Sequence, residues 1–447
     1  GNALCRREII RSEPVAPGQT LPFSLLPRSA SKAGPGRRHR QHLETTSALA
    51  AHAMFSTPTS NTRQLLFLLT LAAFASSASF RVCDPMLPQL AGLFAASTAE
   101  VALIITGFTI AYGAMQLIYG PLGERFERFR IVTRATALCA VGSLGAALAP
   151  SLEMLTACRI LTGVAAAGII PMSMATVSDL VPAEQRQATL ARLFSGQILG
   201  MVFGQVLGGL CVDFGLWRLA FGVLTGLYLL IAFALWRKAH LGATTRGAAG
   251  PAGSMASLYR RALGMLHARE TRGVMACFFV EAVLVFGVLA FLPLYLHQRF
   301  GLALSQATLP LLLYGAGGLL FSFVAARLGR RINHWAFPVG AAGLVALANG
   351  VALYAGHPGW IFAAALLSGF GYYQLHSALL FQITQRAPEA RSLALALSVS
   401  LFFVGQSVGV SAAGWLVDQG RITLVFAIAA LGMPLLGLAA GRQIRPA

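Results

Sequence analysis

The stretch Leu152-Glu153-Met154-Leu155-Thr156-Ala157-Cys158-Arg159-Ile160-Leu161-Thr162-Gly163 places one arginine inside an otherwise apolar run. A charged side chain at the centre of a membrane helix costs about 2.5–3.5 kcal/mol on insertion scales, so such residues usually have a function. Similar apolar runs recur from about Leu65 to Leu438, the mean hydropathy is +0.68, and only 11% of the residues are charged. The sequence therefore predicts an all-α integral membrane protein.

Apolar runs of near-spanning length are separated by charged or Gly- and Pro-rich breaks. Because a helix of about twenty apolar residues crosses a bilayer, these runs predict about twelve transmembrane helices. The predicted spans lie near residues 65–87, 101–119, 131–149, 152–176, 188–210, 216–236, 273–296, 304–328, 335–354, 360–383, 393–416 and 423–438.

The positive charges that give the net charge of +19 follow a pattern that indicates membrane topology. Arginines gather in alternate loops, near 125–130, 186–192, 327–331 and 386–391, and are sparse in the loops between them. Because basic loops stay in the cytoplasm, we expect a multi-pass protein of the cytoplasmic (inner) membrane with both termini cytoplasmic. Membrane topology explains the positive charge, so we expect no nucleic-acid partner.

The sequence lacks the patterns of common cofactor sites. Its six cysteines are scattered singly, so we expect no metal site and no disulfide framework. Neither Lys32 nor Lys238 follows a glycine, which excludes the G-x-x-x-x-G-K-[ST] nucleotide loop. We expect no cofactor, and a proton gradient rather than ATP as the energy source.

Composition divides the chain into segments. Residues 1–53 lack both the apolar core of a signal peptide and the pattern of a folded domain. Translation could instead begin at Met54, in which case the extension is not native. The expected segments are a disordered cytoplasmic tail (1–63), a six-helix bundle (64–236), a cytoplasmic linker (237–272), a second six-helix bundle (273–440) and a short cytoplasmic tail (441–447).

The two halves repeat each other. Residue types at nine positions of the first half recur 205 positions later, and Pro88 and Pro293 keep the same offset. Parallel repeats related by an axis along the membrane normal are a known transporter architecture. The repeat predicts two bundles related by a pseudo-twofold axis. The nine positions are Glu184, Arg186, Gly200, Gly204, Gly209, Val212, Asp213, Gly215 and Phe221.

The loop Gly120-Pro121-Leu122-Gly123-Glu124-Arg125-Phe126-Glu127-Arg128-Phe129-Arg130 resembles the signature loop of the major facilitator superfamily. Glu124 replaces the usual Asp, and Glu127 replaces a usual Gly. The resemblance implies a conformational latch, because such charges can pair across helices in one state and part in another. The alternative is an interfacial charge cluster that only fixes topology. The latch residues would be Gly120, Glu124, Arg125, Arg128, Asp179, Arg327 and Arg330.

Spans four and five resemble motifs of the efflux branch of this superfamily. Span four, with Arg159, resembles the arginine motif of proton-coupled exporters. Span five resembles the glycine-rich antiporter motif, although Gln205 stands where that motif has Pro. Small residues at every fourth position also allow close helix packing, which would serve symporters too. The motif residues are Gly200, Gly204, Gln205, Gly208 and Gly209.

Three intramembrane charges, Asp84, Arg159 and Glu281, are candidates for proton coupling. Asp84 and Arg159 both fall in the outer half of the membrane and could pair, although Arg81, three residues before Asp84, could satisfy it locally. Glu281 has no charged neighbour within its span, so burial disfavours its charged form. It therefore suits a proton site, and the alternative is a protonated acid packed between helices.

Polar side chains on otherwise apolar spans are candidates for the substrate cavity: Tyr112, Gln116, Tyr373, Gln374 and His376. Each could instead form an interhelical hydrogen bond. The resemblance implies a monomeric drug/proton antiporter in the lipid bilayer that exports a small organic compound by alternating access. The alternatives are an uptake symporter or facilitator, or a membrane enzyme, receptor or channel. No clustered catalytic set or pore ring supports this last group.

Overall fold

The computed structural model describes residues 60–238, 260, 264–331, 335–387 and 391–444. The predicted N-terminal tail as far as residue 59, most of the predicted linker and residues 445–447 lie outside this part. Within the described residues every element is a helix and no strand is present, which confirms the all-α prediction.

The first half of the chain contains nine helical elements among the described residues. They are α2 (Ser60–Arg81), η1 (Asp84–Met86), α3 (Leu87–Phe94), α4 (Thr98–Arg125), α5 (Arg128–Ala147), α6 (Leu152–Ala166), α7 (Ile169–Leu180), α8 (Ala183–Asp213) and α9 (Trp217–Arg237). The second half contains α11 (Arg269–Phe300), α12 (Leu304–Ala307), α13 (Leu309–Arg331), α14 (Ala336–Tyr354), α15 (Pro358–Arg386), α16 (Arg391–Asp418) and α17 (Ile422–Ile444).

Ten helical segments of the described chain are long and apolar enough to cross a membrane. Two other long helices, α5 and α15, coincide with predicted spans but fall outside this set. Helix α5 has Arg128, Arg130 and Arg134 in its first two turns, and α15 carries polar side chains such as Gln374 and His376 at its centre. The count of twelve spans therefore stays a prediction.

Prolines break the first span and lengthen it. Helix α2 ends at Arg81, and Pro85 and Pro88 each occupy the first turn of a new helix, where the missing N–H costs nothing. The helical segment therefore continues to Phe94 and passes the predicted end at residue 87.

Another proline divides the fourth span. Pro171 has no N–H for the carbonyl of Ala167, four residues earlier, and the chain breaks between α6 and α7 at this point. The side-chain amide of Gln116 donates to the Ala167 carbonyl over 3.4 Å. Gln116 thus satisfies a carbonyl at a helix break, whereas the sequence predicted it in the substrate cavity.

Glycines set the packing of α8 on α2 and of α16 on α11. A Cβ at Gly200 or Gly204 would overlap the carbonyl oxygens of Phe74 or Ala78 of α2. A Cβ at Gly405 or Gly409, 205 positions later, would overlap those of Phe279 or Val283 of α11. Only a residue without a side chain permits backbones this close. The packing partners keep the same 205-residue offset as the glycines.

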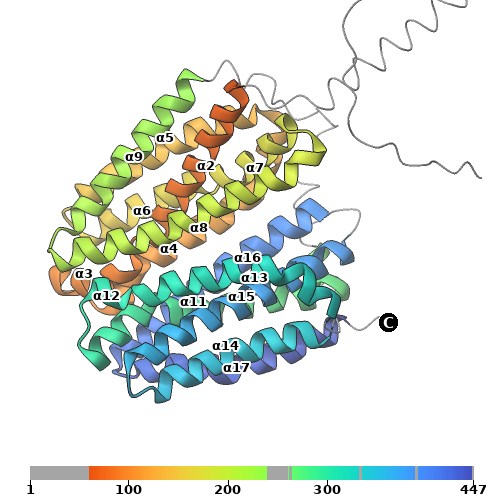
Figure 1. Cartoon of the computed structure of the whole chain (residues 1–447). Helices are drawn as coiled ribbons and strands as arrows, with labels where there is room; N and C mark the ends of the chain where they lie inside the picture. Colours follow the sequence, from red (N-terminus) through yellow and green to blue (C-terminus); the bar gives the residue numbers. More distant parts are fainter. Residues whose placement is uncertain (1–59, 239–259, 261–263, 332–334, 388–390, 445–447) are drawn as a thin grey trace, which may run out of the picture. The chain divides into compact units, whose positions relative to one another are not determined.

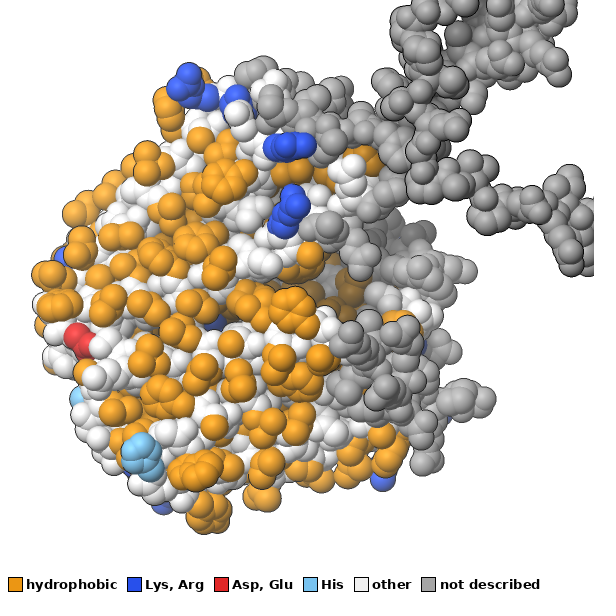
Figure 2. Space-filling view, viewed as in Figure 1, with side chains coloured by type: hydrophobic (Ala, Val, Ile, Leu, Met, Phe, Trp, Pro, Cys, Tyr) orange, Lys and Arg blue, Asp and Glu red, His pale blue; other side chains and the backbone are white. Residues whose placement is uncertain are grey.

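Helices α2–α9 and α11–α17 form two groups within the compact unit Pro58–Ala447 (Figure 1). The groups meet where α4 packs on α16 and where α8 packs on α12 and α13. Hydrophobic side chains are spread over the described part of the face seen in Figure 2, as expected for a surface in contact with lipid.

Two aspartates join the groups at one end. The Asp213 carboxylate, at the end of α8, accepts the N–H groups of Leu304 and Ser305 over 3.1 and 3.0 Å. The Asp418 carboxylate, at the end of α16, accepts those of Thr98 and Ala99 over 2.8 and 2.9 Å. Each acid caps the N-terminus of a helix in the other half, a favourable position for a negative charge. We call these contacts the aspartate clamps.

Candidate functional site

A cavity of about 240 Å³ lies between the two halves. Helices α2 and α8 of the first half and α11, α13, α15 and α16 of the second contribute its walls. Aromatic rings dominate the lining, and a few polar groups interrupt it, as in typical small-molecule sites. The polar wall residues are Arg81, Gln197, Gln205, Tyr314, Tyr372 and Tyr373.

The charge in this wall is a buried ion pair. The Arg81 guanidinium lies 3.0 Å from the Asp84 carboxylate, and both side chains are buried. The guanidinium also lies near the rings of Phe80 and Phe286, 5.2 and 4.8 Å from their centroids. The sequence left two partners open for Asp84, and the structure pairs it with Arg81, one helical turn away. An Asp84–Arg159 ion pair is not formed.

Arg159 is only 1% exposed, and its contacts are neutral groups. Its Nε donates to the carbonyl of Ile104 in α4 over 3.3 Å, and one terminal nitrogen donates to Ser79 Oγ in α2 over 3.1 Å. The guanidinium stacks on Phe108, 4.3 Å from the ring centroid. Among the described residues it forms no ion pair, so α6 holds a fixed positive charge against α2 and α4.

Glu281 of α11 and His376 of α15 form a second buried pair. Glu281 is fully buried, and its Oε2 lies 3.0 Å from His376 Nδ1. Its other oxygen has no hydrogen-bond partner among the described residues. The imidazole packs on Phe402 and Tyr372, 5.1 and 5.5 Å between ring centroids, and both rings line the cavity. The rings of Tyr372 and Phe402 therefore lie between this pair and the cavity.

The structure distributes the five predicted cavity residues differently. Tyr373 lies in the wall. Tyr112 packs against the wall residue Phe403, with 4.6 Å between the two ring centroids. The Gln374 amide donates to the carbonyl of Phe337 over 2.8 Å, so it ties α15 to α14. Gln116 lies at its helix break and His376 lies on Glu281. Four of the five residues are therefore absent from the lining of the cavity.

Sequence reasoning missed much of the wall. Arg81 was considered only as a local partner of Asp84, and Tyr314 was not singled out. Neither has a spacing signal, because the wall draws on six helices that are far apart in the sequence. The glycine repeat, which brings α2 and α8 together, was the available clue.

The fold and this cavity can be compared with known proteins. The family profile described as the Major Facilitator Superfamily matches residues 69–392, well over half of the chain. The chain belongs to the major facilitator superfamily. Together with the long apolar helices, this membership identifies an integral membrane protein.

Several relatives are transporters of this superfamily. The putative uncharacterized transporter YgaY of Escherichia coli K12 is 32% identical over 176 residues, 39% of this chain and 44% of YgaY. YceJ of Bacillus subtilis, an uncharacterized MFS-type transporter, is 24% identical over 338 residues, 74% of this chain and 84% of YceJ. The multidrug export protein EmrB of Haemophilus influenzae is 29% identical over 173 residues, 39% of this chain and 34% of EmrB. The chain thus spans less than half the length of YgaY.

Solved structures share the fold. A peptide transporter POT, in complex with alafosfalin, superposes with a TM-score of 0.70 and 18% identity over 88% of this chain and 97% of that one. A bacterial homolog of the human lysosomal transporter Spinster, inward-facing and unoccupied, gives a TM-score of 0.69 and 17% identity over 88% and 100%. At these identities the likeness shows the fold alone.

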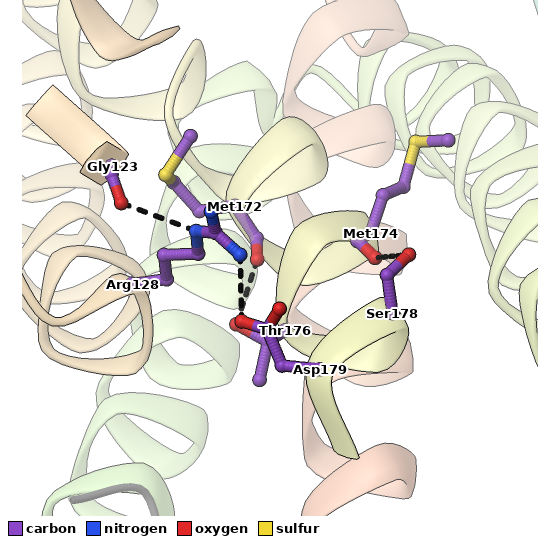
Figure 3. A network of polar contacts seen from close by, with 7 residues as sticks. All are labelled: Gly123, Arg128, Met172, Met174, Thr176, Ser178 and Asp179. Atoms are coloured by element: carbon purple, nitrogen blue, oxygen red, sulfur yellow. Dashed lines mark hydrogen bonds and ion pairs between the residues drawn. The ribbon is translucent and has the colours of Figure 1, made fainter. Parts of the chain in front are cut away.

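The superfamily loop is anchored by Arg128 (Figure 3). Its guanidinium lies 2.6 Å from the Asp179 carboxylate of α7 and donates to the Gly123 carbonyl over 3.1 Å. A Cβ at Gly123 would meet the Met172 sulfur, whereas Gly120 faces open space. The expected Arg128–Asp179 contact is present, but it joins two helices of the same half. The side chains of Glu124, Arg327 and Arg330 lie outside the described part, and the latch between conformational states stays a prediction.

The glycine motif of α8 serves both packing and the cavity. Gly200 and Gly204 face the backbone of α2, Gly208 faces the carbonyl of Val82 just after this helix, and a Cβ at Gly209 would approach the Cα of Ser305 at 3.2 Å. The Gln205 side chain does not take part in this glycine packing; it lies in the wall of the cavity, beside Asp84. The residue that departs from the superfamily's antiporter pattern is thus the one that meets the cavity.

Proposed function

We propose that this transporter exports a small organic compound in exchange for protons, by alternating access at the 240 Å³ cavity. The observation that carries the proposal is the Glu281–His376 pair directly behind the cavity wall. Both groups can gain or lose a proton, unlike the Arg81 guanidinium, which keeps its charge. The resemblance to exporters such as EmrB supports the direction.

The coupling step follows from burial. A carboxylate with no water around it is strongly disfavoured unless it is paired, so Glu281 is held either by His376 or by a proton. Substrate entering between Tyr372 and Phe402 moves the rings against which His376 packs, and this weakens the pair. Proton uptake and substrate binding thereby act on the same side chains.

Reconstituted vesicles test the proposal. A deletion and an overexpression strain are first screened against toxic compounds, and a compound with altered resistance becomes the transport substrate. An imposed proton gradient should drive that compound against its concentration, and Glu281→Gln should remove this flux while substrate binding survives. The control Glu153→Gln removes an exposed acid. Unchanged proton-driven flux in Glu281→Gln would refute the role of the pair.

Gln205 favours a second candidate, a proton-coupled uptake symporter or facilitator for a metabolite. Its amide stands in the cavity wall in place of the antiporter proline and adds a hydrogen-bonding group for a polar substrate. The direction of flux decides between the two. Uptake driven by an inward proton gradient, together with altered growth on a sole nutrient, would support the symporter.

We further infer an inner-membrane location with the basic loops and both termini in the cytoplasm. The chain would act as a monomer. Protease added to inside-out vesicles should cut first in the predicted linker, residues 237–272. Cleavage only from the outer face would reverse this topology.

A further inference from the structure

A second and larger cavity, of about 740 Å³, lies where α4 ends and α5 begins. Residues of both helices and the turn between them line it, and it shares no lining residue with the central cavity. Its walls combine two kinds of side chain. One is basic, Arg125, Arg130 and Arg134, and the other is apolar, including Phe126 and Leu138.

The charge of this cavity is positive. Three arginines and one acid, Glu127, line it, which gives a net charge of +2. Glu127 is 2.6 Å from Arg130, so this pair is internally neutral. Arg125 and Arg134 are exposed, and neither forms an ion pair with a side chain in the described part of the protein. Two cationic groups are therefore available to a ligand.

From the position of Arg134 and the residues beyond it, we infer that this cavity lies at a membrane boundary. Arg134 is six residues into α5, about 9 Å from its first residue, where headgroups meet hydrocarbon. Beyond it, the large exposed residues of α5 are apolar: Leu138, Val141 and Leu144 are 37%, 59% and 48% exposed, and Leu148, directly after the helix, is 67% exposed. Their spacing of three or four residues places them along one side of the helix. The basic cavity therefore continues into an apolar stripe.

We propose that this cavity binds the headgroup of an anionic phospholipid in the leaflet beside the basic loops. Arg125 and Arg134 contact the phosphate, and one acyl chain lies along the apolar stripe of α5. Basic pockets between transmembrane helices favour such headgroups. Free phosphate would satisfy the arginines but would leave the walls at Phe126 and Leu138 uncovered.

The experiment compares three probes on the purified full chain in a neutral detergent: short-chain phosphatidylglycerol, short-chain phosphatidylcholine and inorganic phosphate. Binding is measured by titration calorimetry. The test variant is Arg125→Gln with Arg134→Gln. The matched control is Arg192→Gln with Arg237→Gln, which removes two exposed arginines outside the cavity. Melting temperatures without lipid check that both variants fold.

Phosphatidylglycerol should bind the unmodified protein more tightly than either other probe. The test variant should lose about 30-fold in this affinity, roughly fivefold per arginine, while the control changes by less than about twofold. Phe126→Ser should weaken phosphatidylglycerol binding and leave phosphate unaffected. Equal affinity for phosphate and phosphatidylglycerol would reduce the cavity to a free-anion site. Equal affinity for phosphatidylcholine, or no loss in the test variant, would overturn the proposal.

Discussion

The two halves of the chain share a backbone arrangement but carry different charges at their centres. Gly200 and Gly405 pack on equivalent turns of α2 and α11, and Asp213 and Asp418 form equivalent clamps. The buried ionisable groups at the centres of the halves do not repeat. Glu281 has Ser76 at the equivalent position 205 residues earlier.

The unequal charges give the halves different chemistry. The first half pairs its acid, Asp84, with Arg81, a permanent cation, and holds a second fixed charge at Arg159. The second half pairs its acid, Glu281, with His376, a side chain that is not a permanent cation. Under the proposed function, the repeated parts would serve the movement of the halves, and the unrepeated charges would serve the coupling to protons.

The largest expected effect is that of Glu281→Gln, which should abolish proton-driven flux. The amide cannot release a proton, yet it keeps the size and hydrogen-bonding ability of the acid at His376. Flux in reconstituted vesicles and substrate binding are measured together. Asp84→Asn is the comparison in the first half, and it should keep proton coupling. If Asp84→Asn and not Glu281→Gln uncouples the transporter, the proton site lies in the first half.

Arg159→Ala should be inactive although correctly inserted, because it removes the donors to Ile104 and Ser79 that tie α6 to α4 and α2. Arg159→Lys keeps the charge but loses the planar fork, so it should retain part of the activity. Flux in vesicles measures both. Full activity of Arg159→Ala would remove Arg159 from the mechanism.

A double-variant cycle then separates the two arginines. In flux measurements, Asp84→Asn combined with Arg159→Lys, which retains part of the activity, should be additive within about 0.5 kcal/mol, because these side chains are not paired. Asp84→Asn with Arg81→Gln should deviate from additivity, because these two form the ion pair. The reverse result would mean that Asp84 changes partner during transport.

Gly200→Ala and Gly405→Ala should each lower stability by about 1–3 kcal/mol, because the new Cβ overlaps a carbonyl of the partner helix. The losses should be similar, since both glycines occupy equivalent positions. Thermal unfolding in detergent measures them. Gly222→Ala, in α9 with open space at this point, should be neutral or slightly stabilising. A loss confined to one half would contradict the shared packing.

Asp213→Ala and Asp418→Ala should each weaken the closed arrangement at the clamped end by about 0.5–2 kcal/mol, as for the loss of a helix cap. Spin-label distances across that end should shift towards longer values, by similar amounts for the two variants. Asp213→Glu, which keeps the charge on a longer side chain, should shift them less. No shift in the double variant would show that the clamps do not hold the halves together.

Hydropathy and the repeat predicted the fold because both can be read directly from the order of residues along the chain. Apolar runs fix where helices cross the bilayer, and Gly200 and Gly204 fix which face of α8 can approach another helix. Prolines were the main source of error in boundaries. Pro85 and Pro88 start new helical turns, and whether a proline ends or only interrupts a span depends on the carbonyls that other helices satisfy, as Gln116 does for Ala167.

By itself, the sequence determined that this is a helical membrane protein with repeated halves, and that Asp84, Arg159 and Glu281 are charges inside it. Only the tertiary structure decided their partners. A buried charge pairs with whichever group lies within about 4 Å, and that distance depends on how helices pack. Local spacing made Arg81 available to Asp84, but nothing in the sequence indicates that α11 and α15 bring together Glu281 and His376, which are 95 positions apart.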